Sequence, residues 1–204
     1  MKKKQCAALI TASLMLFNNA AVFTAAAADG TSQTSVYAYE NTVTYEVTGG
    51  TISFDKDTGE VYHATDNVTE VIIPEEIEGA KVRTIRYNAF LNKHKLIKVV
   101  LPDTVTSIGD SAFANCTNLK SINLPDSVTS IGAYAFAGSP LGSTDDSVLK
   151  LPASLETLGV YPFDICNGVT AFALAESNPN FAVKDGILYT KDMQTLLACP
   201  AKKS

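Results

Sequence analysis

A short acidic segment is the first place where the sequence could bind a metal ion. Asp55, Asp57 and Glu60 are spaced somewhat like the ligands of a calcium loop, in which oxygen atoms at alternate positions surround the ion. A calcium loop also needs a third acidic residue and a glycine at fixed positions, and here both are misplaced. The segment therefore predicts a hairpin turn rather than a calcium site.

The two histidines of the chain, His63 and His94, are the next candidates for chemistry. Neither lies at a zinc-ligand spacing from a cysteine or from the other histidine, so both are expected on the surface or at the end of a structural unit. The sequence also has no glycine-rich phosphate loop, serine elbow or pair of catalytic carboxylates. No catalytic residue, metal ligand or cofactor is predicted.

Composition and charge restrict the classes of partner. The chain of 204 residues is 46% hydrophobic and 18% charged, which is enough apolar material for a folded core. Lys2 to Lys4, the apolar residues 6–17 and the small residues Ala26 and Ala28 resemble a secretory signal peptide, residues 1–28. Its removal changes the formal charge from −5 to −8. An acidic protein is a poor ligand for nucleic acid, and no stable insertion into a membrane is expected after cleavage.

A sequence repeat dominates the remainder of the chain. The segment "LPDTVTSIGDSAF" from residue 101 returns as "LPDSVTSIGAYAF" from residue 124, and the interval of 23 residues recurs between Leu151 and Leu174. Two intervals are longer, because residues 77–82 and 140–147 contain insertions. A fixed period of this size predicts a solenoid, in which stacked coils bury the side chains that one coil alone cannot.

Each coil has the same expected parts. Alternating apolar residues before a proline predict a short strand, and "TSIG" predicts a second one. Gly109, Gly132 and Gly159 are expected at a turn that needs backbone freedom. The segment "DSAF" predicts one helical turn capped by Asp110. Phe113 and Phe136 are expected to stack inside the solenoid.

The cysteines fit the same register. Cys116 and Cys166 occupy equivalent positions two coils apart, so their Cα atoms should lie about 10 Å apart, beyond the reach of a disulfide. Both are expected to pack in the core as free thiols. Cys199 is expected to be a small apolar filler near the C-terminus.

The repeats "LPDTVTSIGDSAFANCTNLKSI", "IPEEIEGAKVRTI" and "NPNFAVKDGILYTKDMQTLLACP" closely resemble the BspA-like subtype of bacterial leucine-rich repeat proteins, over about residues 45–200. The resemblance implies a right-handed leucine-rich repeat solenoid, with a parallel β-sheet on its concave face and short strands and helical turns on its convex side. Arg86 in place of glycine and Pro162 in place of alanine depart from the pattern without changing the expected fold.

The two ends differ from the coils. After a flexible linker, residues 29–44, the segment 45–67 predicts a capping hairpin that turns at Asp57 to Gly59. Residues 68–174 are expected to form the coils. Residues 175–204 predict a C-terminal hairpin or cap that turns at Asp185-Gly186.

The predicted function is non-catalytic binding outside the cell. The resemblance implies a secreted or cell-surface protein that adheres to a host or bacterial protein, and the alternative is a structural spacer without a specific ligand. The binding surface is expected on the concave face, at positions one and three before the strand anchors. These positions are Glu70, Ile72, Lys98, Val100, Ser121, Asn123, Val148 and Lys150, continued by Ala171 and Ala173. Ile72 and Val100 would form an apolar patch, although β-branched residues are also good strand formers. Asn123 is expected to be exposed, with a replacement by alanine costing about half a kcal/mol or less.

Overall fold

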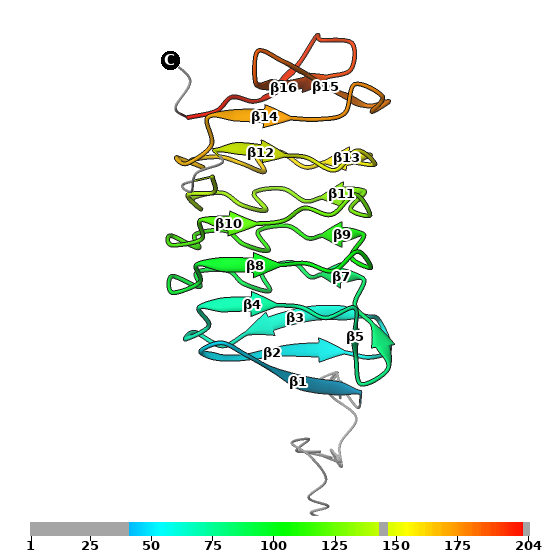
Figure 1. Ribbon diagram of the computed structural model, residues 1–204, viewed down its shortest axis with the longest axis vertical. Coiled ribbons are helices and arrows are strands. Elements are labelled where there is room, and N and C mark those ends of the chain that lie inside the picture. The colour runs from blue at the N-terminus through cyan, green and yellow to red at the C-terminus, as the bar shows by residue number, and fades with distance from the viewer. Residues whose placement is uncertain (1–40, 143–146, 202–204) are drawn as a thin grey trace, which may run out of the picture.

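A computed structural model describes residues 41–142 and 147–201. The predicted signal peptide and residues 29–40 of the predicted linker lie outside the described residues. The chain forms the predicted solenoid, with short strands stacked coil upon coil along one long axis (Figure 1). Each coil supplies a first strand and then a second strand. Equivalent strands of neighbouring coils pair in parallel, with one interruption among the first strands.

The second strands of the coils extend the three N-terminal strands into one unbroken sheet of seven strands, which we call the continuous sheet. Its spatial order is β1 (Thr42–Val47), β2 (Gly50–Asp55), β3 (Glu60–Ala64), β7 (Thr84–Ile85), β9 (Ser107–Ile108), β11 (Ser130–Ile131) and β13 (Thr157–Leu158). The strands that precede the prolines form a second sheet, which we call the divided sheet because it is in two parts. One part contains β4 (Glu70–Ile72), β8 (Lys98–Val100) and β10 (Ser121–Ile122), and the other contains β12 (Val148–Lys150) and β14 (Ala171–Ala173).

Antiparallel hairpins lie at both ends, as predicted. At the N-terminal end, β1 pairs with β2 and β2 with β3, and β3 then pairs in parallel with β7 of the first full coil. The strand β1 begins at Thr42, within the segment expected to be a linker. At the C-terminal end, β15 (Phe181–Lys184) turns at Asp185-Gly186 into β16 (Ile187–Thr190), which also pairs with β17 (Leu196–Ala198). The insertion at residues 77–82 forms a small hairpin of its own from β5 (Glu76–Ile77) and β6 (Ala80–Lys81).

The core consists of columns of equivalent side chains from successive coils. Phe90, Phe113, Phe136 and Phe163 stack nearly parallel, with ring centroids 4.9, 5.4 and 5.7 Å apart. The first three of these rings are fully buried. The expected stacking of Phe113 on Phe136 inside the solenoid is therefore confirmed, and it fixes the register of the coils.

The predicted helical turn is wrong, because no helix occurs within residues 41–142 and 147–201. The corner turns, residues 86–92, 109–115, 132–138 and 159–165, instead have two positions with positive φ each. In the second of them, these are Ser111 and Asn115. Left-handed residues at these places direct alternate N–H groups towards the next coil, and the N–H groups of Ser111 and Phe113 donate to the carbonyl oxygens of Ala133 and Ala135. A helix would use the same groups within one coil.

Two further expectations about this turn are corrected. Asp110 does not cap its own turn, since its Oδ1 accepts the N–H of Ala133 in the next coil at 2.7 Å. Gly132 and its equivalents do not have positive φ; they are needed because coils approach closely there. A Cβ on Gly132 would lie 2.5 Å from the backbone nitrogen of Asp110. Arg86 is tolerated at the equivalent position because strand β3, rather than another corner turn, lies beneath it.

The residues that the structure describes include no helix long and apolar enough to cross a membrane.

Candidate binding surface

The divided sheet turns the predicted binding residues to the outside. In β4, β8 and β12, the middle residue is buried and its neighbours are more exposed, which is the expected alternation. The anchors Ile73, Leu101 and Leu151 are buried, as predicted. Of the outward positions, Glu70, Ile72, Lys98, Asn123, Val148 and Lys150 are exposed, and Val100, Ser121, Ala171 and Ala173 are half-buried.

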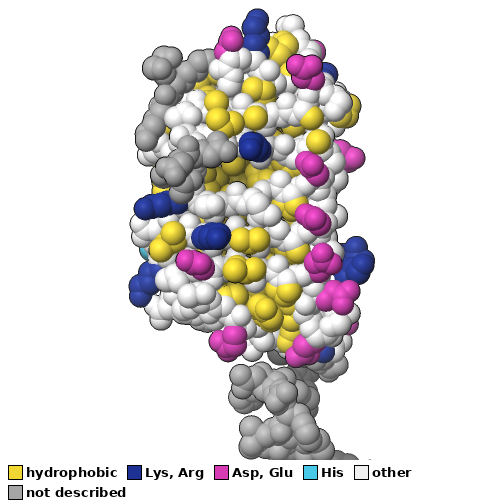
Figure 2. Space-filling view, viewed as in Figure 1, with side chains coloured by type: hydrophobic (Ala, Val, Ile, Leu, Met, Phe, Trp, Pro, Cys, Tyr) yellow, Lys and Arg dark blue, Asp and Glu magenta, His cyan; other side chains and the backbone are white. Residues whose placement is uncertain are grey.

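An apolar pair lies beside charged residues on this face. Ile72 is opposite Val100 in the register of β4 and β8, and its side chain is 59% exposed. Two residues earlier, Glu70 is opposite Lys98, and both are exposed. Figure 2 shows hydrophobic side chains between acidic and basic ones on this face. The pair is therefore a small apolar surface with charges of both signs beside it.

Asn123 has a structural role that the sequence interpretation missed. Its Oδ1 accepts the N–H of Leu101 at 2.6 Å, and its Nδ2 donates to the carbonyl oxygen of Leu101 at 2.8 Å. The equivalent bond one coil earlier runs between two backbone groups, from the N–H of Ile73 to the carbonyl oxygen of Val100. The Asn123 side chain thus replaces a missing ladder bond. It is exposed, as expected, but the two hydrogen bonds lead us to expect a larger cost of its replacement by alanine than the sequence suggested.

The divided sheet is interrupted between β10 and β12. Here the carbonyl oxygen of Lys120 accepts the N–H of Gly142. In the regular register the donor would be Ser147, which is equivalent to Lys120 one coil later. The N–H of Leu124 has no acceptor among the described residues, although the equivalent group of Leu151 donates to Ala173. A cavity of about 320 Å³ opens between the strands, lined by Lys120 to Leu124, Leu141, Gly142 and Val148 to Lys150. In the sequence, the only sign of this cavity is the interval of 27 residues between Leu124 and Leu151.

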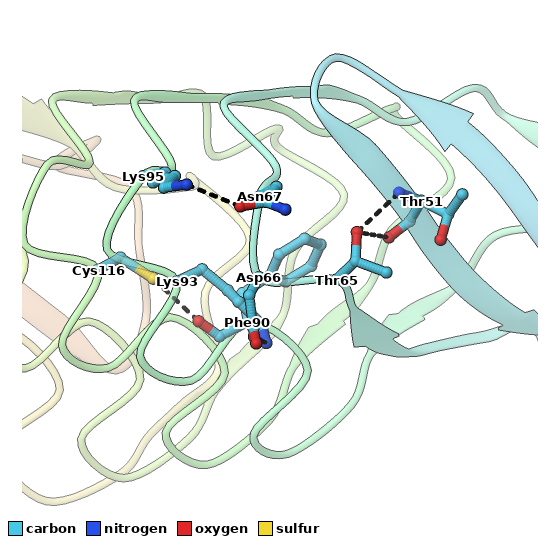
Figure 3. Close-up of polar contacts among 8 residues, drawn as sticks. All are labelled: Thr51, Thr65, Asp66, Asn67, Phe90, Lys93, Lys95 and Cys116. Atoms are coloured by element: carbon cyan, nitrogen blue, oxygen red, sulfur yellow. Dashed lines mark hydrogen bonds and ion pairs between the residues drawn. The ribbon is translucent and has the colours of Figure 1, made fainter.

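Polar residues at the N-terminal end form a clamp between coils, which Figure 3 shows in detail. The buried Lys93 extends its Nζ to Oδ1 of the exposed Asp66 at 2.6 Å, and Lys95 donates to Oδ1 of Asn67 at 2.7 Å. The hydrogen bond from Lys93 lowers the pKa of the Asp66 carboxyl. Burial and the charge of Lys93 lower the pKa of His63, against the opposing effect of Asp66. These contacts fasten the first full coil to the hairpin end.

The buried cysteines belong to a column that begins at Lys93. Cys116 and Cys166 are buried free thiols, so the prediction that they are not joined is confirmed. Their Sγ atoms contact the carbonyl oxygens of Phe90 and Phe136 at 3.0 and 3.2 Å. Burial raises the pKa of both thiols to about 12, which leaves no thiolate at neutral pH to act as a nucleophile. Cys199 is exposed, so its predicted role as an apolar filler is wrong.

The other candidate residues also have structural partners. Asp55 Oδ1 accepts the N–H groups of Asp57 and Thr58, and the carboxylate of Asp57 accepts both bonds from Asn41 Nδ2. The two carboxylates therefore hold the turn between β2 and β3. His94 is exposed at a corner, where its Nδ1 lies 3.3 Å from Thr117 Oγ1.

Comparison with solved structures gives several bacterial leucine-rich repeat proteins. A leucine-rich repeat protein from Bacteroides capillosus is 25% identical, with a TM-score of 0.50, over 65% of this chain and 98% of that one. The pneumococcal vaccine antigen PcpA is 25% identical, with a TM-score of 0.56, over 71% of this chain and 41% of that one. A leucine-rich repeat protein from Eubacterium ventriosum is 21% identical, with a TM-score of 0.55, over 80% of this chain and 52% of that one.

No curated protein matches the chain. The model of one protein family matches residues 83–193, more than half of the sequence, with six copies of its repeat. The family is described as the BspA type leucine rich repeat region. The matched residues include the corner turns, the phenylalanine column and the strands of both sheets from β7 onwards. The chain therefore belongs to the BspA type leucine-rich repeat family.

Proposed function

We propose that this protein acts outside the cell as a non-catalytic binding protein, and that it contacts a host or bacterial protein through the outer face of the divided sheet. Leucine-rich repeat solenoids present such faces as extended binding surfaces. The similarity to a protein described as a pneumococcal vaccine antigen supports a location that antibodies can reach. The basic n-region and apolar stretch within residues 1–28 support export.

The observation that carries the proposal is the outward-facing pair formed by the exposed Ile72 and the half-buried Val100. The two residues face each other across hydrogen-bonded strands, so their side chains form one continuous apolar surface. Apolar patches that are rimmed by polar residues commonly mark protein contacts, and Glu70 and Lys98 supply charges of both signs beside this one. A partner with an apolar centre and a mixed-charge rim would fit this arrangement.

A binding role also agrees with the state of the reactive groups. The thiols of Cys116 and Cys166 are buried and protonated, and Asp55 and Asp57 hold a turn. Each of these groups stabilises the solenoid, which supports a scaffold that presents a surface.

The proposal is tested by measuring retention of the purified protein on immobilised extracellular matrix proteins and on bacterial cells. A double variant, Ile72→Ser with Val100→Ser, should lose at least tenfold in affinity for any partner that is found, while its circular dichroism and melting temperature stay close to those of the wild type. Tyr87→Ser is the matched control, since Tyr87 is also exposed but lies on a corner turn.

Unchanged affinity in the folded double variant would move the site away from the divided sheet. Failure of the wild-type protein to bind any of these surfaces would favour the spacer role instead.

A further inference from the structure

The last corner turn exposes large side chains at both of its left-handed positions, where the first two corner turns have only small polar residues. Tyr161 and Ile165 are 63% and 62% exposed. The residues equivalent to Tyr161 are Asn88, Ser111 and, in the third corner turn, Tyr134, whose ring centroid lies 5.8 Å from that of Tyr161. Those equivalent to Ile165 are Asn92, Asn115 and Gly138. Val160 and Leu196 of β17 are also largely exposed. A solvent-exposed apolar cluster has therefore replaced polar turn residues at the end of the solenoid.

The backbone makes these residue types costly. Tyr161 and Ile165 have φ values of 50° and 54°, in the left-handed region, where asparagine and glycine are favoured and a β-branched residue is strained. Tyr161 contacts the ring of Tyr134, but both it and Ile165 stay largely exposed, so burial in their own chain recovers little of this cost. Such departures from local rules without internal compensation are typical of functional positions.

The same turn ends a ladder of backbone hydrogen bonds. One coil earlier, the N–H groups of Tyr134, Phe136 and Gly138 donate to the carbonyl oxygens of Val160, Pro162 and Asp164. The equivalent N–H groups, those of Tyr161, Phe163 and Ile165, have no acceptor within residues 41–142 and 147–201. Three donors at alternate residues therefore face away from the preceding coil.

The C-terminal hairpin covers other parts of this end. Gly186 accepts the N–H of Phe172 in the divided sheet, and Nδ2 of the buried Asn178 donates to the carbonyl oxygens of Ala153 and Leu155. Between the corner turn and β17 lies a cavity of about 280 Å³. Phe163, Phe172 and Leu197 contribute to its apolar lining. Among the described residues that line it, the exposed Asp164 is the charged one.

We propose that this corner, residues 160–166 with β17, binds a peptide segment of a partner protein. The segment lies along the turn as the next coil does elsewhere in the solenoid, and presents carbonyl groups at alternate residues to the three N–H groups. Its apolar side chains contact Tyr161, Ile165 and Leu196, and a lysine or arginine between them pairs with Asp164. The inference deepens the proposed binding function, on which it rests, but it assigns a second surface at the end of the solenoid.

Selection from a random peptide library tests the proposal with an unidentified partner. A phage-displayed library of random nonapeptides is selected on the wild-type protein and counter-selected on the double variant Tyr161→Asn with Ile165→Asn. Asparagine suits a left-handed backbone, so this variant should melt at the same temperature or higher. Selected peptides should contain a lysine or arginine among apolar residues, and bind the variant at least tenfold more weakly. Asp164→Lys should weaken them by a similar factor.

The divided-sheet variant, Ile72→Ser with Val100→Ser, distinguishes a binding site at the corner from the binding site proposed above on the divided sheet. Peptides that bind the corner should retain full affinity for it. Peptides that fail to bind this variant, but bind the corner variant normally, would overturn the corner site and leave the divided sheet as the binding surface. Acidic selected peptides, or none that distinguish wild type from the corner variant, would also overturn it. Self-association of the wild type that the corner variant abolishes would assign the corner to a second copy instead.

Cys199 provides a direct readout of occupancy. It is exposed and lines the cavity beside the corner. A bound peptide should slow its alkylation at least fivefold, as measured by peptide mass mapping, while the buried Cys116 and Cys166 remain unmodified with or without peptide. An unchanged alkylation rate at saturating peptide would place the peptide elsewhere.

Discussion

The continuous and divided sheets are built from the same coils, yet the longer coil between Leu124 and Leu151 interrupts only the divided one. Across this coil, β11 pairs with β13 and the rings of Phe136 and Phe163 stay 5.7 Å apart. On the other side of the same coil, β10 and β12 are not paired. The extra residues follow the corner turn and precede β12, so they displace that strand alone.

The other insertion has a different consequence. Residues 77–82 lie between the divided-sheet strand β4 and the continuous-sheet strand β7, and they close on themselves as the hairpin of β5 and β6. Both sheets remain paired around them, β4 with β8 and β3 with β7. An insertion that satisfies its own backbone leaves both ladders intact. The insertion at residues 140–147 does not, and its position just before β12 determines that the divided sheet opens.

The largest expected effect concerns the core that both sheets share. Phe113→Ala should lower the free energy of unfolding by about 3 to 5 kcal/mol, because the ring is fully buried between Phe90 and Phe136 and its loss leaves a cavity. Urea denaturation measures this change, with the exposed Tyr87→Ala as control. Equal urea midpoints for Phe113→Ala and Tyr87→Ala would contradict the placement of the phenylalanine column in the core that both sheets share.

A smaller loss of stability is expected from a substitution where the corner turns of successive coils meet. A Cβ on Gly132 would lie 2.5 Å from the nitrogen of Asp110 and 2.7 Å from the carbonyl carbon of Gly109. Both neighbours are backbone atoms that cannot rotate away, so Gly132→Ala should cost about 2 to 3 kcal/mol, near the upper end for overpacking. Thermal denaturation of Gly132→Ala and the wild type measures this change. A loss of stability below about half a kcal/mol would show that the coils are not in close contact at this turn.

A change in the divided sheet should cost less, since its outer edge is partly solvated. Asn123→Ala removes both side-chain bonds to Leu101 and should lower stability by about 1 kcal/mol. Ser121→Ala is a suitable control on the same strand region. If both variants unfold at the same urea concentration, the bridge contributes nothing and Asn123 is a neutral surface position after all.

A change of similar size but opposite sign is expected when the insertion is removed. Deletion of residues 143–146 restores the 23-residue interval between Leu124 and residue 151. The strands β10 and β12 should then pair, and the new ladder bonds should raise stability by about 0.5 to 1.5 kcal/mol. The gain is measured by urea denaturation, with disappearance of the cavity checked by structure determination. A less stable or unfolded deletion variant would contradict the view that the extra residues alone separate the strands.

The repeat made the stacked coils and their columns predictable from sequence. Once Leu101 and Leu124 were aligned, the buried positions of Phe113, Phe136, Cys116 and Cys166 followed from the register. The hairpin turns at both ends could be predicted from local glycine and aspartate patterns.

The features that failed to follow from sequence depend on contacts between coils. The segment "DSAF" has the composition of a helical turn, but the N–H groups of Ser111 and Phe113 bond to residues 22 positions further along the chain. The bridge from Asn123 to Leu101 is equally non-local, although an asparagine where other coils have Ile72 and Val100 was an available signal. The interval of 27 residues revealed an insertion but not which sheet it would open.

Amide hydrogen exchange is the most direct test of the unequal effect on the two sheets. The N–H of Gly159 donates across the longer coil to the carbonyl oxygen of Ile131 at 2.8 Å, whereas the N–H of Leu124 has no acceptor among the described residues. Leu124 should therefore exchange at least a hundredfold faster than Gly159, and faster than Leu101 and Leu151 in the flanking coils. Protection of Leu124 equal to that of Gly159 would show that the divided sheet is closed in solution and would contradict the account.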